Sequence, residues 1–237
     1  MSDRLPRDPP RDAPHPLDNP AFTALTGPHA GFAERRGAAA RYLPSISPLS
    51  GFAGEPDAAA WADMAALCGP GGATMVVGVT TPPPAGWTTV LQIAGVQMVD
   101  ESLEAAADPE AIPLGPADVP AMIDLVARTN PGPFEARTLD LGGYLGIFRG
   151  GALAAMSGRR MRPPGYLEVS AVCTDPALRG RGLANRLVRA VAAGIRELDA
   201  IPFLHVAAAN EAAIGLYRKL GLVVRRPMLF TLVRAPG

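Results

Sequence analysis

Apolar residues recur at helical spacing between Leu183 and Leu198, directly after a glycine-rich stretch. The apolar positions lie three or four residues apart and would share one inward face: Leu187, Val188, Val191, Ile195 and Leu198. The arginines of the segment lie mostly outside this stripe: Arg186, Arg189 and Arg196. The pattern therefore predicts an amphipathic helix that packs against a core on one side and meets solvent on the other.

Two further elements are predicted before this helix. Residues 117–129 predict a helix, and its apolar positions are Met122, Ile123, Leu125 and Val126. Residues 144–161 predict a β-hairpin, because Gly150 and Gly151 can adopt the positive φ angles that a tight turn needs.

The remaining elements of the second half are three strands and a helix. Strands are predicted over residues 166–174, 202–208 and 226–233. A helix is predicted over residues 210–221, with Asn210 as its N-cap and Gly221 as its C-cap. The order helix, hairpin, strand, helix, strand, helix, strand predicts an α/β or α+β domain built on a single sheet.

The first half has a less regular pattern. Residues 57–68 predict a helix with Trp61, Met64 and Leu67 on one face, and residues 73–80 and 87–99 predict strands. Residues 100–120 are acidic and proline-spaced, which is typical of a linker, so a boundary is expected near residue 110. The expected organisation is a disordered tail over 1–16, one domain over 17–110 and another over 111–237.

Composition narrows the class of protein. The 237 residues are 48% hydrophobic, enough for one large domain or two small ones, and the formal net charge is zero. A strongly basic nucleic-acid binder is therefore not expected. The two cysteines and three histidines are scattered, so neither a disulfide scaffold nor a metal site is expected. No apolar run reaches a membrane-spanning length and the N-terminus has no hydrophobic core, so a cytoplasmic protein without membrane partners is expected.

The stretch TDPALRGRGLANRL, residues 174–187, is suited to a polyanion. Gly180 and Gly182 leave backbone N–H groups accessible just before a helix N-terminus, and Arg179 and Arg181 add positive charge. The pattern Arg/Gln-x-x-Gly-x-Gly/Ala is matched by Arg179, Gly182 and Ala184, but a glycine-rich turn without a ligand matches it equally well. A Walker loop would need Gly-Lys-Ser/Thr, and a dinucleotide loop would need a third glycine; neither is present.

A second motif follows at a fixed distance. Asn210, Ala213, Tyr217 and Gly221 lie on one predicted helix as Asn-x-x-Ala-x-x-x-Tyr-x-x-x-Gly. Together the two motifs resemble the GNAT superfamily of N-acetyltransferases over residues 117–233, with Leu222 where the family often has Phe. The first half carries no second copy of the loop, so the chain resembles GNAT proteins in which a smaller degenerate GNAT-like half precedes a mixed central sheet flanked by helices.

The resemblance implies acetyl-CoA as co-substrate. In that family the glycine loop, here residues 179–184 with Arg179, Gly180, Arg181, Gly182, Leu183 and Ala184, binds the pyrophosphate. The backbone of Val172, Cys173 and Thr174 would pair with the pantetheine arm where two strands splay apart. The N–H of Val172 would then face the thioester oxygen as the oxyanion donor.

The resemblance also implies catalytic side chains, each with an alternative. Tyr217 would protonate the departing thiolate, or is a core aromatic. Glu168 would deprotonate the amine directly or through water, or is a surface strand residue. Strict alternation gives Leu167, Val169 and Ala171 one face and Glu168, Ser170 and Val172 the other, which suits the base role. Asn210 would bind the cofactor or only cap its helix.

Other polar residues carry weaker expectations. His205 is expected to be a core histidine with its hydrogen bonds satisfied, and Cys173 lacks the basic neighbour that a nucleophile needs. Arg159, Arg160 and Arg162 are expected at a solvated strand end, with the steering of an anionic acceptor as the alternative.

The function that follows is an acetyl-CoA-dependent N-acetyltransferase. A primary amine of a small molecule or amino acid would attack directly in a ternary complex, and the first half would shape the acceptor site or an interface, including that of a homodimer. The alternative is a non-catalytic acyl-CoA-binding or regulatory module. A nucleotide-binding oxidoreductase is disfavoured by the missing third glycine.

Overall fold

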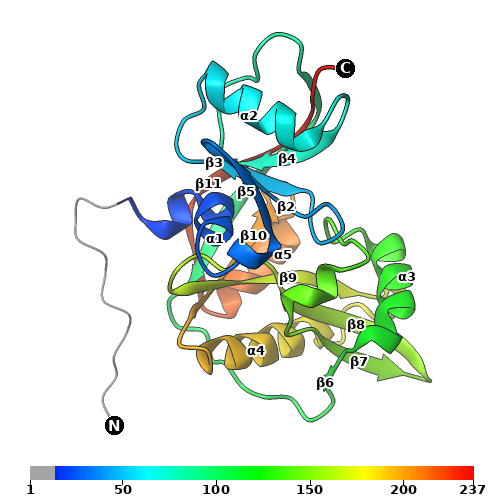
Figure 1. Ribbon diagram of the computed structural model, residues 1–237. Coiled ribbons are helices and arrows are strands. Elements are labelled where there is room, and N and C mark those ends of the chain that lie inside the picture. Colours follow the sequence, from blue (N-terminus) through cyan, green and yellow to red (C-terminus); the bar gives the residue numbers. More distant parts are fainter. Residues whose placement is uncertain (1–13) are drawn as a thin grey trace.

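The computed structural model describes residues 14–237, and a mixed sheet of 11 strands runs through this part of the chain (Figure 1). The strand order is β1-β2-β3-β4-β11-β5-β10-β9-β8-β7-β6. The strands are β1 (Ala33–Arg36), β2 (Ala39–Tyr42), β3 (Leu49–Phe52), β4 (Ala73–Val77), β5 (Thr88–Asp100), β6 (Ile112–Pro113), β7 (Leu145–Arg149), β8 (Ala152–Arg159), β9 (Tyr166–Thr174), β10 (Ile201–Ala207) and β11 (Leu222–Arg234). The helices are α1 (Pro20–Leu25), α2 (Ala58–Cys68), α3 (Val119–Thr129), α4 (Leu183–Arg196) and α5 (Glu211–Lys219).

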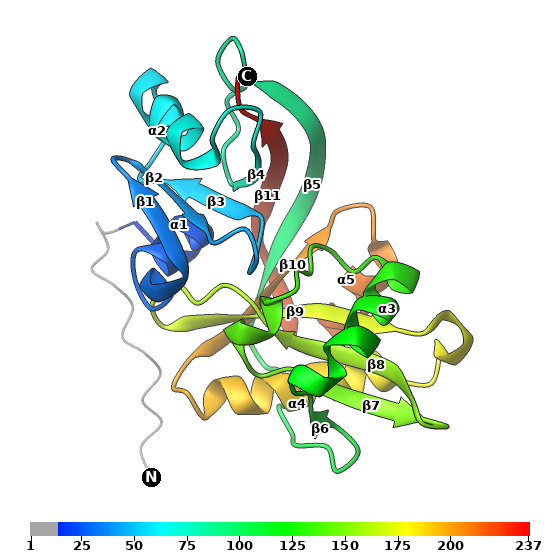
Figure 2. The ribbon, with the colours of Figure 1, turned by 45° about the vertical axis from the view of Figure 1, so that its right-hand side comes forward.

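Two long strands, β5 and β11, join the two parts of the sheet. β5 pairs antiparallel with β10 on one side and with β11 along its whole length on the other. The end of β11 continues alongside β4. Figure 2 shows the two strands curving side by side through the molecule. A strand from the first half therefore separates β10 from β11, which both come from the second half, and the boundary near residue 110 stays a prediction.

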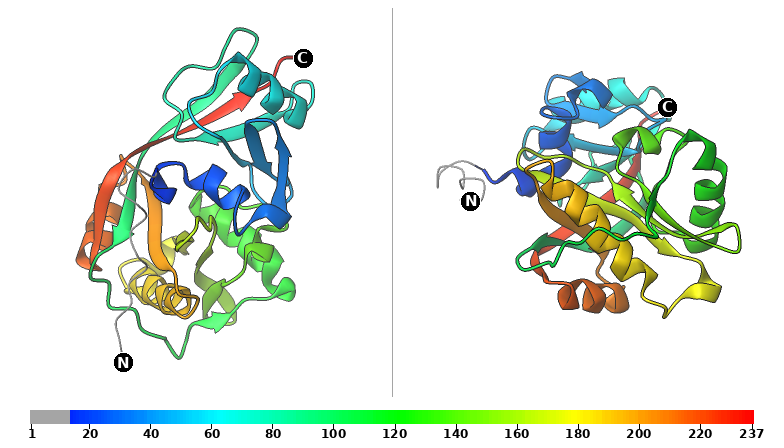
Figure 3. Two further views of the ribbon diagram at one scale, coloured as in Figure 1. Left: turned by 60° about the vertical axis from the view of Figure 1, so that its left-hand side comes forward. Right: turned by 90° about the horizontal axis from the view of Figure 1, so that it is seen from below.

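Helices cover both faces of the sheet (Figures 1 and 3). On β4, Met75 and Val77 pack in the same core cluster as α1, and Val76 packs in the cluster of α2. Helix α3 packs against one face of the second half of the sheet, whereas α4 and α5 share a cluster on the other. This arrangement confirms the expected mixed sheet with flanking helices.

Most elements expected in the second half are confirmed, with one correction to a buried face, at Leu198. The hairpin of β7 and β8 turns at Gly150 and Gly151, which both have positive φ. Leu198 is exposed because α4 ends at Arg196, and Ile123 on α3 is exposed as well. The short strands β1, β2 and β3 were not predicted, because their alanine- and glycine-containing four-residue sequences carry little periodic signal.

The acidic segment after β5 is held against α4 by ion pairs. Arg186 forms a bidentate pair with Asp108 at 2.6 Å, and Arg196 contacts Asp100 at 2.7 Å. Burial of Leu103 adds an apolar contact. The arginines expected outside the stripe of α4 therefore fix the path of this segment.

Residues 1–13 of the expected tail lie outside the described residues. At its end, His15 accepts a hydrogen bond from the backbone N–H of Leu17 and contacts the hydroxyl of Tyr166 at 3.0 Å. Within residues 14–237 no helix is both long and apolar enough to cross a membrane.

Candidate active site

Strands β9 and β10 run parallel and then separate. Their pairing spans Tyr166 to Glu168 on β9 and Ile201 to Phe203 on β10, yet β9 continues to Thr174 and β10 to Ala207. A cavity of about 820 Å³ lies where they part. In the described part of the chain, no strand pairs with the backbone groups on the β10 side of residues 169–174, so a ligand arm can take that place.

A β-bulge at Ala171 changes the direction of the β9 side chains. Ala171 has φ of 52°, and the pairing with β8 shifts register at this point. Val172 consequently packs in the cluster that holds Leu167 and Val169, while Ala171 and Cys173 pack with α3. The prediction that Glu168 shares a face with Val172 is therefore wrong, because alternation does not continue through a bulge.

The glycine loop forms an open cradle at the start of α4. Gly180 and Gly182 have φ of 78° and 76°, a region that side-chain-bearing residues rarely adopt. Gly182 is the N-cap of α4 and offers no side-chain hydrogen bond to the N–H groups of the first helical turn. Apart from the adjacent residues in the chain, no heavy atom of residues 14–237 lies within 4 Å of a Cβ built at either glycine. The loop therefore fits a pyrophosphate, which would meet free N–H donors and the positive end of a helix.

The sequence-predicted cofactor residues meet around the same cavity. Its lining includes Val172, Cys173, Thr174, Arg179, Ala184, Asn210 and Tyr217. Gly180, Arg181 and Gly182 are exposed and follow the lining residue Arg179 in the chain, and the Leu183 side chain is buried between α4 and the sheet. The hydroxyl of Thr174 is buried and has no hydrogen-bond partner among the described residues, so this part of the site fits a polar ligand.

Tyr217 on α5 presents a protonated phenol to the cavity. Its side chain is 7% exposed, and burial, followed by the nearby Cys173 thiol, raises the pKa of the phenol to about 12. The hydroxyl is therefore protonated throughout the neutral range and is available as a donor. Asn210 accepts a hydrogen bond from the backbone N–H of Ala213 at 3.1 Å, so it does cap α5 while it lines the cavity.

Glu168 lies in the protein interior, paired with Arg160. The guanidinium donates two hydrogen bonds to the carboxylate, at 2.8 Å and 2.7 Å, and the N–H of Met161 donates a third at 3.2 Å. Burial would raise the pKa of Glu168, but the charge and hydrogen bonds of Arg160 and the contact with His205 outweigh it and hold that pKa well below its usual range. Glu168 is fully buried and is absent from the cavity lining.

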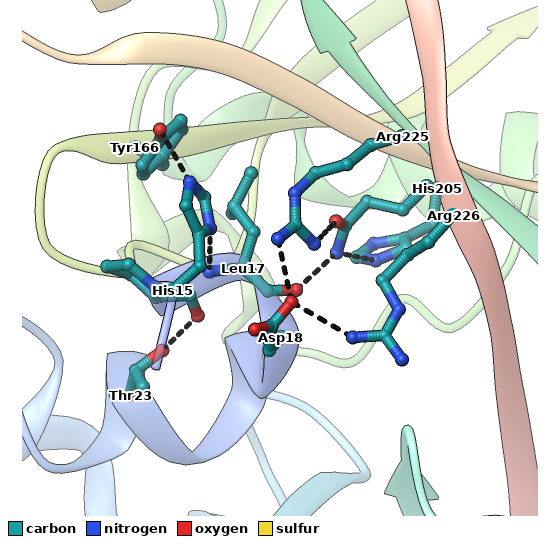
Figure 4. Close-up of polar contacts among 10 residues, drawn as sticks. His15, Leu17, Asp18, Thr23, Tyr166, His205, Arg225 and Arg226 are labelled. Atoms are coloured by element: carbon teal, nitrogen blue, oxygen red, sulfur yellow. Dashed lines mark hydrogen bonds and ion pairs between the residues drawn. The ribbon is translucent and has the colours of Figure 1, made fainter. Parts of the chain in front are cut away.

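His205 on β10 connects this pair to a polar network. Its Nδ1 lies 2.7 Å from a Glu168 oxygen, and its Nε2 lies 3.1 Å from the side-chain nitrogen of Gln97. Gln97 in turn donates to the carbonyl of Leu17 and accepts from Arg225, which also contacts Asp18 (Figure 4). The expectation of a satisfied core histidine is confirmed.

Two expectations for the arginines at the end of β8 need correction. Arg160 is only 9% exposed and lines the cavity, so it is not at a solvated strand end. Arg159 is half-buried, and its Nε has no hydrogen-bond partner among the described residues. Both depart from the expectation because the strand end packs against α4, α1 and the preceding loop rather than against solvent.

The sequence did not identify the far wall of the cavity. This wall comes from β4, β5 and β11 and is apolar: Met75, Leu91, Ile93 and Phe230. The loop after α3, at residues 130–133, closes another side. No motif marks these positions, and the left-handed conformation of Asn130 in a Thr-Asn-Pro-Gly stretch is the one local signal.

Comparison with known proteins identifies the family. A protein assigned to the GNAT family of acetyltransferases, from Novosphingobium aromaticivorans, has a crystal structure that is 37% identical to this chain. The match covers 94% of this chain and 100% of that one, with a TM-score of 0.86. The chain belongs to the GNAT family. A model of the family described as FR47-like protein matches residues 144–230 of this GNAT protein.

More distant relatives share the fold or a part of the sequence. A GCN5-related N-acetyltransferase from Kribbella flavida is 16% identical to this chain. The structural match covers 92% of this chain and 96% of that one, with a TM-score of 0.60. The N-alpha-acetyltransferase RimI of Mycobacterium tuberculosis is 37% identical over 81 residues, which are 33% of this chain and 50% of that protein. This GNAT protein thus spans half the length of that curated relative.

Proposed function

We propose that this GNAT protein transfers the acetyl group of acetyl-CoA to a primary amine of a small molecule or amino acid. The observation that carries the proposal is one cavity that runs from the open glycine cradle, past the separated ends of β9 and β10, to Tyr217 and an apolar wall. The cavity volume of about 820 Å³ lies in the range of small-molecule sites, and its lining combines apolar side chains with a few polar groups.

The glycine cradle would hold the pyrophosphate of the cofactor. Gly180, Gly182 and the first turn of α4 supply N–H donors, and Arg179 supplies charge from the cavity wall. The free backbone edge of β9 would pair with the pantetheine arm. Acetyl-CoA, when bound, supplies an activated thioester.

The backbone N–H of Val172 and the phenol of Tyr217 would each take part in acetyl transfer. The N–H of Val172, beside the bulge, would donate to the oxygen on which negative charge develops. Tyr217 would protonate the departing thiolate, since its raised pKa keeps the phenol protonated. The acceptor amine would attack the thioester directly in a ternary complex, with both substrates in the one cavity. The C–S bond then breaks as the C–N bond forms, and the proton that the amine nitrogen loses would restore the one that Tyr217 gives to the thiolate.

The geometry does not favour Glu168 as the atom that takes the amine proton. The carboxylate is buried, its oxygens already accept hydrogen bonds from Arg160, Met161 and His205, and its lowered pKa makes it a weak base. We assign it instead the role of positioning Arg160 and His205 at the cavity wall.

A thiol-release assay with mass spectrometry of the acceptor tests the proposed function. Over a panel of amines and aminoacyl compounds, we expect coenzyme A release to match acetylated product one to one. Binding of acetyl-CoA in calorimetry without product from any acceptor would contradict the proposal and would favour a non-catalytic acyl-CoA-binding module.

A further inference from the structure

We propose that the acceptor is an amine of low basicity, of which a substantial fraction is uncharged near neutral pH: the α-amino group of an aminoacyl compound whose carboxyl group is amidated and whose side chain is apolar. The inference rests on the proposed acetyl transfer and names the class of acceptor. It follows from what lines the cavity, from the contacts of His205 and from the apolar wall.

The cavity contains no free proton acceptor among the described residues. Its lining holds no aspartate or glutamate, and its titratable side chains are Arg160, Arg179, Cys173, His205 and Tyr217. The arginines remain cationic, and the phenol of Tyr217 and the buried thiol of Cys173 remain protonated at neutral pH. His205 is thus the one side chain of the lining that could act as a base.

Both ring nitrogens of His205 are occupied. Nδ1 lies 2.7 Å from the Glu168 carboxylate, where it must donate its hydrogen. Nε2 faces the amide nitrogen of Gln97 at 3.1 Å, and that amide is held in one orientation. Its oxygen accepts from Arg225 at 3.0 Å, and its nitrogen donates to the Leu17 carbonyl at 2.9 Å.

This orientation leaves His205 without a free lone pair. Gln97 presents an N–H to Nε2, so a proton taken by Nε2 would put two donors face to face. Rotation of the Gln97 amide would instead lose the contacts with Arg225 and Leu17, which Figure 4 shows beside His205. The described residues of the cavity lining therefore offer the incoming ammonium neither a base nor a carboxylate partner.

An acceptor must then arrive deprotonated. An alkyl ammonium with a pKa of about 10.4 is only about 0.1% neutral at pH 7.5, whereas an α-amine with a pKa of about 8 is about 25% neutral. The difference is roughly 200-fold in the concentration of reactive amine. A low-pKa α-amine suits this cavity, and a lysine side chain or a polyamine does not.

The apolar wall of the cavity favours an acceptor with an apolar side chain next to its α-amine. Met75, Ile93 and Phe230 line the cavity beside Leu91, whose side chain is 47% exposed. Apolar surface of this kind is stabilised when an apolar substituent covers it. The side chain next to the α-amine is therefore expected to be apolar.

The first experiment compares matched acceptors with the full-length protein. Phenylalaninamide and phenethylamine share the ring and differ in the basicity of the amine. We expect kcat/KM at pH 7.5 to be roughly 200-fold higher for phenylalaninamide. We also expect the pH profile of each acceptor to rise in a single limb to a midpoint at that acceptor's own pKa.

The possible results distinguish failure of the proposed acceptor class from failure of the proposed acetyl transfer. Equal or better use of phenethylamine or spermidine, or a midpoint that stays fixed when the acceptor changes, would overturn the inference while leaving acetyl transfer intact. A peptide with an N-terminal phenylalanine serves as a further arm: its preference over phenylalaninamide would identify a polypeptide N-terminus as the source of the α-amine. No acetylation of any amine would instead reject the proposed function.

The second experiment tests the wall with a matched pair of variants. Leu91→Glu puts a carboxylate into the cavity, whereas Val90 has a similar exposure of 49% on the same strand and lies outside the lining. We expect Leu91→Glu to lower kcat/KM for phenylalaninamide and raise it for spermidine, each by about fivefold. Val90→Glu should leave both unchanged, and identical behaviour of the two variants would show that Leu91 does not contact the acceptor.

Discussion

Tyr217 and Glu168 are both buried acids, but their neighbours give their pKa shifts opposite directions. Tyr217 is buried without an opposite charge beside it, and its pKa rises to about 12. Glu168 is buried against Arg160, and the ion pair reverses the direction of the shift. The first remains a proton donor, and the second remains an anion that orients its neighbours.

Replacing Tyr217 by phenylalanine tests the donor role. Tyr217→Phe removes the hydroxyl and keeps the ring in its cluster, so we expect kcat to fall about 100-fold while the Kd for acetyl-CoA changes less than twofold. Steady-state kinetics and calorimetry measure the two quantities. Unchanged kcat would show that another group protonates the thiolate.

Replacing Glu168 by glutamine leaves the charge of Arg160 buried and unpaired. We expect the free energy of unfolding to fall by about 3 kcal/mol, as when one partner of a buried ion pair is removed. Urea denaturation at pH 7 measures it. Glu104 is 88% exposed and pairs with Arg189 at 3.5 Å, so Glu104→Gln is the control and should change stability by less than about 0.5 kcal/mol.

The same pair gives a pH dependence with a definite sign. The pKa of Glu168 is lowered in the folded protein, so its contribution to stability is complete above the unfolded pKa of about 4.3 and is lost as the pH falls through the lower folded value. In Glu168→Gln this loss should be absent. An equal acid sensitivity of wild type and variant would argue against the ion pair.

At the scale of elements, the bulge in β9 determines where the strand faces. It turns Val172 toward the α4 side and Ala171 toward α3, at the point where β9 leaves β10. A residue with a Cβ in the left-handed region is strained by roughly 1 kcal/mol. The bulge is therefore held by its surroundings and not by its own sequence.

Glycine substitution measures this strain. In Ala171→Gly, strain relief of about 1 kcal/mol offsets most of two losses, about 0.8 kcal/mol for one buried methyl group and about 0.5–1 kcal/mol for added chain entropy, so we expect stability to fall by less than about 1 kcal/mol. Ala154 on β8 is buried and lacks a positive φ, so Ala154→Gly should lower stability by 1–2 kcal/mol, roughly the sum of methyl loss and added chain entropy. Urea denaturation of both variants measures the free energy of unfolding. Equal losses of this free energy in the two variants would mean that Ala171 is unstrained.

At the scale of the whole molecule, the first half completes the second. β5 supplies the hydrogen-bond partners of both β10 and β11, and residues of β4 and β5 form the cavity wall opposite Tyr217. The sheet cannot close around the site without them. The first half is in this sense a structural part of the site, although it carries no recognisable motif.

Separation of the halves tests this dependence. Residues 111–237 alone would expose the edges of β10 and β11, so we expect no cooperative unfolding transition and poor solubility. Co-expression with residues 1–110 should restore a folded complex that binds acetyl-CoA. A stable fragment 111–237 with full binding would show that β5 is dispensable.

The sequence by itself determined the local elements and the conformation of the glycine loop. Residues 166–174 and the buried stripe of α4 follow from periodicity, and Gly180, Gly182 and Asn210 follow from turn and cap chemistry, because these depend on neighbours in the chain. Only the tertiary structure decided that Glu168 is locked to Arg160, that Val172 changes face and that β5 separates β10 from β11. These depend on contacts between residues far apart in sequence, which a pattern along the chain does not encode.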